Sequence, residues 1–384
     1  MSSARINIAG AGLAGCLIAI YLARFGCSVH IYEKRPDPRR TAPNPYRSVN
    51  LVLSTYSMRL LEEAGLTDLH ALSLPLSGRM MHSRSGAKVF AQYGRRSGDT
   101  FSALMPLEGG YSISRAALNA ALLNSAEEHG VQIRFEQVVT GCDSATGELT
   151  LNGASGSASN VPGDAVLGCD GVSSIIRGKV AEQAGFIQRR PALGYGYKEL
   201  RIPPGPAGCF LIEKDALHLW PRAGFIMSAL PDPDGSFNCN LFMPLAGANG
   251  FEGLQEREDV SRFFAEYFPD MARMVRDLTT QFLERPLHSL AAMHCWPWFS
   301  GKALLLGDAC HTLYPFSGLG ANLALEDCAL LMESIRQFSS DLEQAFLLYA
   351  TDRKSTIERH FETTAVLAPL VLAFLPEEGI TGML

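Results

Sequence analysis

The hydrophobic pattern at the start of the chain predicts a strand, a helix and a second strand. A short apolar run, Arg5–Ala9, leads into a glycine-rich turn at Gly10–Gly15 and then into a longer apolar segment, Cys16–Phe25. The longer segment has the length of a buried helix, and Ser28–Tyr32 has the composition of a buried strand. This order is typical of a βαβ unit.

The middle of the chain has a different pattern. Hydrophobic and polar residues alternate in Leu217–Leu219, Phe225–Leu230 and Phe237–Phe242, and proline-rich turns separate these segments. Such alternation predicts antiparallel strands with one buried face. Elsewhere, helical spacing predicts helices at Ser57–Ala64, Arg115–His129, Val260–Tyr267, Met271–Leu278 and over 320–375, hairpins fill about 136–165, and apolar runs predict strands at Ala165–Gly168 and Ala303–Leu306.

Together these elements predict a mixed α/β fold with a Rossmann-like nucleotide-binding domain and an inserted antiparallel-sheet domain. C-terminal helices follow, and they are expected to cover a pocket. The expected nucleotide-binding parts are 1–75, 106–185 and 286–330, the expected sheet-domain parts are 76–105 and 186–285, and the helices fill 331–384.

Composition and charge narrow the function classes. A net charge of -6 argues against nucleic acid as a partner, because phosphate binding needs a basic face. The nine cysteines include no CxxC pair, so we expect reduced core residues and no metal site. The start of the chain lacks a signal-peptide pattern, and the apolar stretch 365–375 is shorter than the roughly 20 residues of a membrane span. We therefore expect a cytoplasmic protein without a transmembrane segment.

The glycine-rich turn carries a dinucleotide-binding pattern. Gly10 permits the turn, Gly12 allows a pyrophosphate to approach the backbone, and Gly15 allows close packing of helix and strand. Glu33 ends the next strand, where it can accept hydrogen bonds from a ribose. The alternative is a tight βα turn with a surface glutamate. This turn alone does not separate FAD from NAD.

Three later stretches add to this pattern. Asp170 lies in Gly168–Arg177 and Asp308 lies in Gly307–His311, and each stretch follows a short apolar strand. Either aspartate could instead belong to a plain turn or to a helix N-cap. Gly318–Asn322 leads into a helix, whose N-terminus would direct backbone N–H groups at an anion. A simple helix start is the alternative there.

This combination of motifs resembles the class A, single-component flavoprotein aromatic hydroxylases, for which para-hydroxybenzoate hydroxylase is the reference fold. The resemblance implies bound FAD, transient NADPH or NADH, and O2 as co-substrate. It assigns the ribityl chain of FAD to Asp308, and FAD with the nicotinamide coenzyme to Asp170. No catalytic triad or metal is required, so we interpret His311 as structural.

Other stretches resemble kynurenine 3-monooxygenase more narrowly, from residue 5 to about 330. They include Arg47–Leu51, Gly78–His82, Ser112–Arg115, Gly196–Leu200, His218–Pro221, Leu241–Pro244 and Glu326–Cys328. The resemblance implies a small aromatic carboxylate or amino-acid substrate, whose carboxylate is held by Arg79 and Tyr93. A surface arginine and a core tyrosine are the alternative.

The expected site residues form three groups. The resemblance places Phe242 and Phe316 around the substrate beside Arg79 and Tyr93, although strand core and a turn proline are alternatives for Phe242 and Pro315. Pro315, Phe316 and Gly318 are expected near the flavin ring. The expected FAD contacts are Gly10, Gly12, Leu13, Ala14, Gly15, Glu33, Lys34, Arg35, Arg47, Val52, Arg115, Asp170, Asp308, Gly320, Ala321 and Asn322.

The chain departs from the family pattern at several positions. The family has Gly-Gln-Gly-Met-Asn where Gly318–Asn322 stands, histidine in bacterial members at Ser317, and a substrate-binding asparagine at Leu367. A further substrate-binding tyrosine falls beyond Leu384. The carboxylate end of the substrate is thus expected to be kept while the other end is altered. Free L-kynurenine and a related compound of a specialised biosynthetic pathway both stay open.

The resemblance implies hydroxylation through a C4a-hydroperoxyflavin. N-hydroxylation or epoxidation by the same species, a reductase or oxidase, and a non-catalytic FAD-binding protein are the alternatives. A monomer and a homodimer are equally compatible with the sequence.

Overall fold

A six-stranded sheet forms the centre of the nucleotide-binding region in the computed structural model. The structure describes residues 4–41, 49–93, 109–152, 158–247, 249–339 and 341–374, with side chains as far as residue 365. The central strand β1 (Arg5–Ala9) pairs in parallel with β2 (Ser28–Tyr32), as the βαβ pattern predicted, and also with β12 (Ala165–Gly168). The order is β20-β21-β12-β1-β2-β8, completed by β20 (Phe299–Ser300), β21 (Ala303–Leu305) and β8 (Gln132–Arg134).

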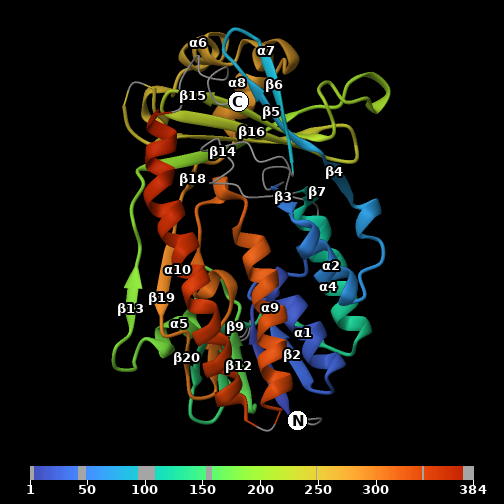
Figure 1. Cartoon of the computed structure of the whole chain (residues 1–384), viewed down its shortest axis with the longest axis vertical. Coiled ribbons are helices and arrows are strands. Elements are labelled where there is room, and N and C mark those ends of the chain that lie inside the picture. Colours follow the sequence, from blue (N-terminus) through green and yellow to red (C-terminus); the bar gives the residue numbers. More distant parts are fainter. Residues whose placement is uncertain are drawn as a thin grey trace.

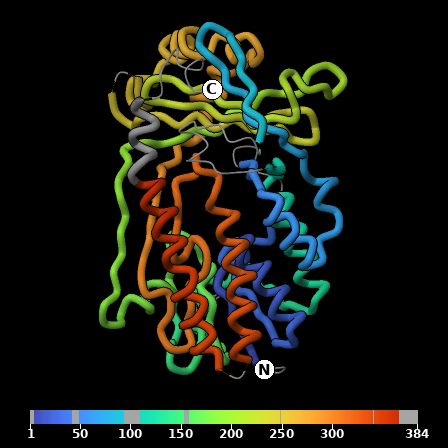
Figure 2. The backbone as a smooth tube through the Cα atoms, viewed as in Figure 1, coloured from blue at the N-terminus to red at the C-terminus, as the bar shows by residue number. Residues whose placement is uncertain are grey.

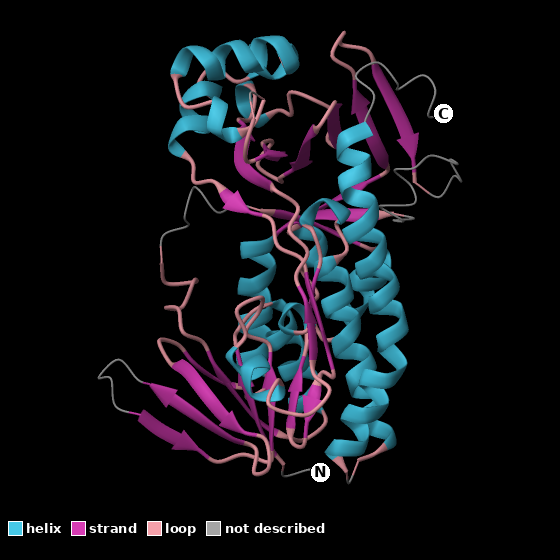
Figure 3. Cartoon of the chain, turned by 90° about the vertical axis from the view of Figure 1, so that its left-hand side faces the viewer, coloured by secondary structure: helices cyan, strands magenta, loops and turns pink. Residues whose placement is uncertain are grey.

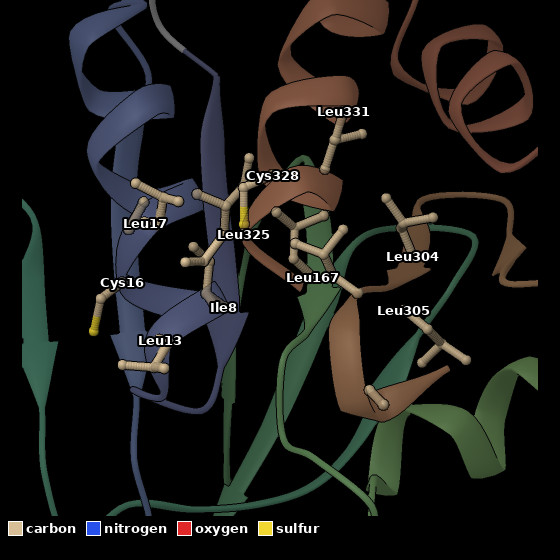
Figure 4. Packing of buried hydrophobic residues seen from close by; sticks show 14 of the residues in the cluster. Ile8, Leu13, Cys16, Leu17, Leu167, Leu304, Leu305, Leu325, Cys328 and Leu331 are labelled. Atoms are coloured by element: carbon tan, nitrogen blue, oxygen red, sulfur yellow. The ribbon is translucent and has the colours of Figure 1, made fainter. Parts of the chain in front are cut away.

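Two helices pack on this sheet through apolar side chains. Figure 4 shows Leu17 of α1 (Leu13–Arg24) and Leu325 of α9 (Gly320–Gln337) close to Ile8 of β1. All three side chains are fully buried. Burial of a leucine or isoleucine side chain stabilises the fold by about 1.5–3 kcal/mol, so this contact fixes both helices on the sheet.

The long C-terminal helix α10 (Leu342–Phe374) lies beside α9 (Figure 3). A buried ionic cluster joins the two helices: Asp327 of α9 accepts a hydrogen bond from Arg353 Nε at 2.8 Å and lies 2.6 Å from His311 Nε2. Burial raises the pKa of Asp327, but His311 and Arg353 together hold it below its usual range. The cluster keeps this carboxylate charged in the core.

A seven-stranded sheet forms the second part of the molecule, at the top of Figure 1. Strands β15 to β17 are antiparallel, as predicted, and β14 pairs antiparallel with β17, whereas β15 and β5 pair in parallel. The order is β18-β14-β17-β16-β15-β5-β6, with β18 (His288–Ser289), β14 (Tyr195–Ile202), β17 (Phe237–Pro244), β16 (Phe225–Pro231), β15 (Ala216–Arg222), β5 (Gly78–His82) and β6 (Lys88–Gln92).

Three helices cover the outer face of this sheet: α6 (Arg257–Tyr267), α7 (Pro269–Met274) and α8 (Leu278–Glu284). The predicted helix at Met271–Leu278 is wrong in its second half. Helix α7 ends at Met274 because Val275 has an extended backbone and packs into the core, and Leu278 begins a new helix. A run of apolar residues at helical spacing cannot reveal such a break.

Smaller elements complete the fold, and Figure 2 traces the chain passing between the two large sheets. One three-stranded sheet contains β3 (Asn50–Leu53), β7 (Gly110–Ser114) and β4 (Ser73–Leu76), and a second contains β9 (Val138–Asp143), β10 (Glu148–Asn152) and β11 (Ala158–Val161). A third contains β13 (Ile187–Arg189), β19 (Met293–Trp296) and β22 (His311–Thr312). The remaining helices are α2 (Thr55–Glu63), α4 (Arg115–Glu128) and α5 (Ile175–Val180). The predicted fold class, a Rossmann-like domain with an inserted antiparallel sheet, is confirmed. Among the described helices, none has the length and apolar character needed to cross a bilayer.

Candidate functional site

The glycine turn after β1 is shaped by two close approaches and one open position. Gly10 has φ +99°, and a Cβ there would lie 2.5 Å from the carbonyl oxygen of Cys169. A Cβ on Gly15 would lie 2.1 Å from the Gly10 carbonyl oxygen, whereas one on Gly12 would meet nothing within 4 Å. Gly10 and Gly15 therefore serve packing. Gly12 leaves room for another group to reach the start of α1.

Glu33 at the end of β2 is tied to this turn. Its carboxylate accepts hydrogen bonds from the backbone N–H of Ala11 and of Arg35, each at 3.0 Å, and from Arg35 Nε. Burial raises the pKa of Glu33, but these hydrogen bonds outweigh burial and lower it below its usual range. The side chain is thus a fixed anion and hydrogen-bond acceptor beside the turn.

Asp170 and Arg177 organise the second motif. Asp170 Oδ2 accepts hydrogen bonds from the first backbone N–H groups of α5, so the helix-capping interpretation applies to this oxygen. Arg177 is buried and donates to the carbonyl of Val172 at 2.7 Å and to the carbonyl of Ala309 at 2.9 Å. Arg177 therefore joins the Asp170 segment to the turn that carries Asp308.

Asp308 offers a free carboxylate. It lies in the turn after β21, and its side chain has no hydrogen-bond partner among the described residues. Burial raises the pKa of Asp308, while Arg115 and His311 oppose this effect. A partly buried carboxylate without a partner is costly, so the position favours a ligand with hydroxyl donors.

Asn322 holds the turn that precedes α9. Its Oδ1 accepts from the Ser54 N–H at 2.8 Å, and its Nδ2 donates to the carbonyls of Val52 and Gly318 at 2.9 Å. Gly318 has φ +67°, which favours glycine. Since these protein groups engage both ends of the Asn322 amide, the side chain positions the turn.

One cavity of about 870 Å³ joins these motifs to the seven-stranded sheet. Most of the predicted site residues line it. They are Gly10, Gly12, Leu13, Ala14, Glu33, Lys34, Arg35, Val52, Arg115, Asp170, Phe242, Asp308, Pro315, Phe316, Gly318, Gly320 and Ala321. Segments from all three parts of the nucleotide-binding region thus meet at a single space.

The end of the cavity at the sheet is largely apolar and aromatic. Phe242 and Phe316 meet edge to face with ring centroids 6.0 Å apart, and Pro315 lies beside them in the lining. The ring of Tyr197 lies 5.6 Å from that of Phe242. Aromatic edges and faces at these spacings suit the binding of another planar ring.

Arg79 and Tyr93 lie together but do not line the described cavity. The Arg79 guanidinium is 5.2 Å from the centre of the Tyr93 ring, and the Arg79 side chain is buried. Burial raises the pKa of Tyr93, which keeps its hydroxyl a neutral donor. Tyr93 packs against the hydrophobic cluster that contains Phe242. Arg79 lies near the start of β5, and Tyr93 directly follows β6.

Other predicted residues lie elsewhere. Gly15 and Asn322 are not part of the cavity lining; they hold the two turns that line it. His311 is buried against Asp327. Arg47 lies outside the described residues. The side chain of Leu367, in α10, is also outside them.

Several residues that line the cavity were not predicted from the sequence. The main ones are Gln137, Thr140, Tyr197, Leu217, Leu219, Ile226, Ser228, Leu230 and Asn240. Those on the sheet recur at every second position of β15, β16 and β17, so strand alternation carried the signal. Nothing in the sequence indicated which face of the sheet would meet the cavity.

The residues present fit a bound dinucleotide. The open space at Gly12 and at Gly320 lies at the N-termini of α1 and α9, where backbone N–H groups favour an anion. Glu33 and Asp308 offer carboxylates for ribose and ribityl hydroxyls. One continuous cavity joins the N-terminus of α1 to the N-terminus of α9.

Comparison with known proteins decides the family. The sequence matches the FAD binding domain family over residues 3–192 and 256–363. It is 41% identical over 366 residues to a kynurenine 3-monooxygenase of Myxococcus xanthus, covering 93% of this chain and 76% of the relative. The chain belongs to the kynurenine 3-monooxygenase family. Kynurenine 3-monooxygenases of Flavobacterium psychrophilum (37% identity) and Salinispora arenicola (38%) match 92% and 91% of this chain, and 77% and 76% of their own lengths.

Solved structures agree on the fold of this kynurenine 3-monooxygenase family member. A 2-methyl-3-hydroxypyridine-5-carboxylic acid oxygenase aligns with a TM-score of 0.75 at 23% identity, covering 97% of this chain and 92% of that one. PqsL of P. aeruginosa aligns with a TM-score of 0.75 at 18% identity, over 99% of each chain. The para-hydroxybenzoate hydroxylase-like fold is therefore confirmed. The chain is an FAD-dependent monooxygenase of the aromatic hydroxylase class.

Proposed function

We propose that this enzyme hydroxylates a small aromatic substrate that carries a carboxylate and is related to kynurenine or tryptophan. NADPH or NADH is the proposed reductant and O2 the proposed oxidant. The observation that carries the proposal is one continuous cavity of about 870 Å³ among the described residues, lined by nucleotide-binding motifs at one end and by an aromatic wall at the other. Its volume is in the range of small-molecule sites.

The nucleotide end supplies the groups that would hold FAD. Gly12 and the start of α1 would bind the pyrophosphate, Glu33 the ribose, and Asp308 the ribityl hydroxyls. Bound FAD supplies electron transfer from the coenzyme and activation of O2. The backbone N–H groups of Gly320 and Ala321, at the start of α9, would stabilise negative charge on the flavin ring.

The sheet end would orient the substrate. Phe242, Phe316 and Pro315 would hold the aromatic ring and exclude water. Arg79 and Tyr93 would bind the carboxylate, because a guanidinium forms paired hydrogen bonds with it and a phenol adds one more. The buried position of Arg79 strengthens such a charge pair, since solvent screens it less.

A substrate panel tests the proposal. The FAD-loaded enzyme is incubated with kynurenine, tryptophan and anthranilate-like acids, and coenzyme oxidation is followed together with product mass. We expect at least one compound to gain one oxygen atom in step with coenzyme oxidation. Coenzyme oxidation that yields only hydrogen peroxide with every compound would contradict hydroxylation. The position of the new oxygen separates ring hydroxylation from N-hydroxylation or epoxidation.

The carboxylate clamp has its own test. Arg79→Ala is expected to raise KM for the best substrate about 10- to 100-fold, the effect of losing a charge-assisted hydrogen bond. Lys88→Ala, on the exposed end of β6, is the control and should leave KM unchanged. An unchanged KM in Arg79→Ala would show that this arginine does not bind the carboxylate.

A further inference from the structure

Two polar side chains interrupt the apolar wall of the sheet. Ser228 of β16 and Asn240 of β17 both line the cavity and are directly paired across the two antiparallel strands. Residues paired in this way present their side chains on the same face of a sheet, with Cβ atoms about 5 Å apart. Ser228 and Asn240 therefore form one polar patch on this wall.

The exposure of the two residues is confined to the cavity. Ser228 is the only residue of β16 that is not fully buried, and Asn240 is half-buried between the buried Cys239 and Leu241. Met227, Ala229, Cys239 and Leu241 point to the other face, into the cluster beneath helices α6 to α8. The remaining accessible surface of Ser228 and Asn240 thus faces the ligand space.

The patch has unused hydrogen-bonding capacity. Within the described part of the chain, neither the Ser228 hydroxyl nor the Asn240 side-chain amide forms a hydrogen bond. A serine hydroxyl can donate and accept, and an asparagine amide offers a carbonyl acceptor and two N–H donors. A polar group at this wall is best satisfied by a ligand that can also donate and accept.

The uncharged lining around the patch favours a neutral ligand group. The neighbouring lining residues of the sheet carry no charge; they are Tyr197, Leu217, Leu219, Ile226, Leu230 and Phe242. Glu199, paired with Asn240 on its other side, is buried. The sheet residues that line the cavity beside the patch offer no cation to an anionic ligand group, and burying an unpaired anion is costly. The patch suits a neutral group.

We propose that Ser228 and Asn240 recognise a neutral hydrogen-bonding substituent, an amine or a hydroxyl, on the aromatic ring of the substrate. The proposal rests on the proposed function, which assigns the ring to this end of the cavity. Sheet pairing separates Arg79 from Ser228 by two strand spacings and two residues, about 12 Å between Cα atoms. One aromatic amino acid can therefore meet both Arg79 and the patch.

The test is a comparison of matched ligands. Dissociation constants are measured from the change in flavin absorbance of the FAD-loaded enzyme, without reductant. The ligands are L-kynurenine, 3-benzoyl-L-alanine, which lacks the ring amine, and 5-hydroxy-L-kynurenine, which adds a ring hydroxyl. The variants are the double substitution Ser228→Ala/Asn240→Leu and the control Ser85→Ala/Asn249→Leu, which alters the same residue types at exposed positions.

We expect the unmodified enzyme to bind at least one ligand about tenfold more tightly than its counterpart with one polar group fewer, as two hydrogen bonds allow. The double variant should reduce this preference to about twofold or less, and the control should keep it. Equal binding within every pair, or a preference that survives in the double variant, would overturn the proposal.

A separate readout distinguishes this proposal from the proposed function. Product mass is measured with NADPH and O2 present. A preference that depends on Ser228 and Asn240, but without any oxygenated product, contradicts the proposed function and supports the patch. Failure of all three ligands to bind contradicts both.

Discussion

At the residue scale, the Asp308 carboxylate is one of the expected FAD contacts. The Asp308 side chain has no hydrogen-bond partner among the described residues and lines the cavity. Asp308→Asn is expected to weaken FAD binding about 10- to 100-fold, because hydrogen bonds to a charged acceptor are the stronger ones. Titration of the apoprotein with FAD, followed by fluorescence, measures this. The exposed Asp68→Asn is the control. Equal affinity in Asp308→Asn and the control would contradict the role.

Asn322 acts through the backbone that it holds. Asn322→Ala removes three hydrogen bonds between α9, β3 and the Gly318 turn, so we expect a loss of about 1–3 kcal/mol in stability together with weaker FAD binding. Ser54→Ala, which removes the cap of α2 and a hydrogen bond to the Ser57 hydroxyl, should lower stability by about 1 kcal/mol without changing FAD affinity. Urea unfolding and FAD titration separate the two effects. Unchanged FAD affinity in Asn322→Ala would contradict a positioning role.

The sequence pattern predicted a nucleotide-binding site, but it did not show which partners each side chain would have. Asn322 was predicted as a cofactor contact, and this stays a prediction. The structure adds that its side chain is engaged by Ser54, Val52 and Gly318. Ser54 and Val52 come from β3 and the residue after it, about 270 residues earlier in the chain. No local pattern reports such a contact.

At the scale of elements, Arg177 connects two motifs that the sequence presented separately. Arg177→Met leaves the carbonyls of Val172 and Ala309 without this donor, and we expect a loss of about 2–3 kcal/mol in stability and weaker FAD binding. Lys179→Met, on the same helix, breaks only a surface ion pair with Glu182 and should cost at most about 1 kcal/mol. Equal losses in the two variants would show that Arg177 does not couple the motifs.

The sequence predicted helices and strands correctly where a single period of hydrophobic residues dominated the segment. The strands Arg5–Ala9 and Ser28–Tyr32 and the alternating strands β15 to β17 were predicted because a single face or a full burial pattern defined them. The break at Val275 was missed because its apolar side chain continues the helical spacing while its backbone is extended. The parallel pairing of β5 with β15 depends on long-range topology, which hydrophobic periodicity does not contain.

At the scale of the whole molecule, a buried histidine pair on the outer face of the seven-stranded sheet makes stability depend on pH. His82 Nε2 lies 2.8 Å from His218 Nδ1, and the His82 ring stacks on Trp220. Burial, helped by His218, lowers the pKa of His82 to about 3. The unfolded chain, with a pKa of about 6.5, therefore binds this proton between pH 6.5 and 3 while the folded chain does not.

Stability should accordingly fall as the pH is lowered through this window, by up to about 1.4 kcal/mol per pH unit from His82. His82→Gln removes the titrating group and should flatten this part of the curve, whereas the exposed His70→Gln should not. Urea unfolding at pH 7.5, 6 and 5 measures the slope. The same slope in the enzyme and in His82→Gln would contradict the assignment.

The central claim is that one cavity joins bound FAD to an aromatic substrate so that oxygen is inserted into that substrate. Turnover of the substrate panel under isotopically labelled O2, analysed by product mass, tests it most directly. We predict that one labelled oxygen atom appears in an aromatic carboxylate product for each coenzyme molecule oxidised. Unlabelled products throughout, with all of the labelled oxygen recovered as hydrogen peroxide, would contradict the claim.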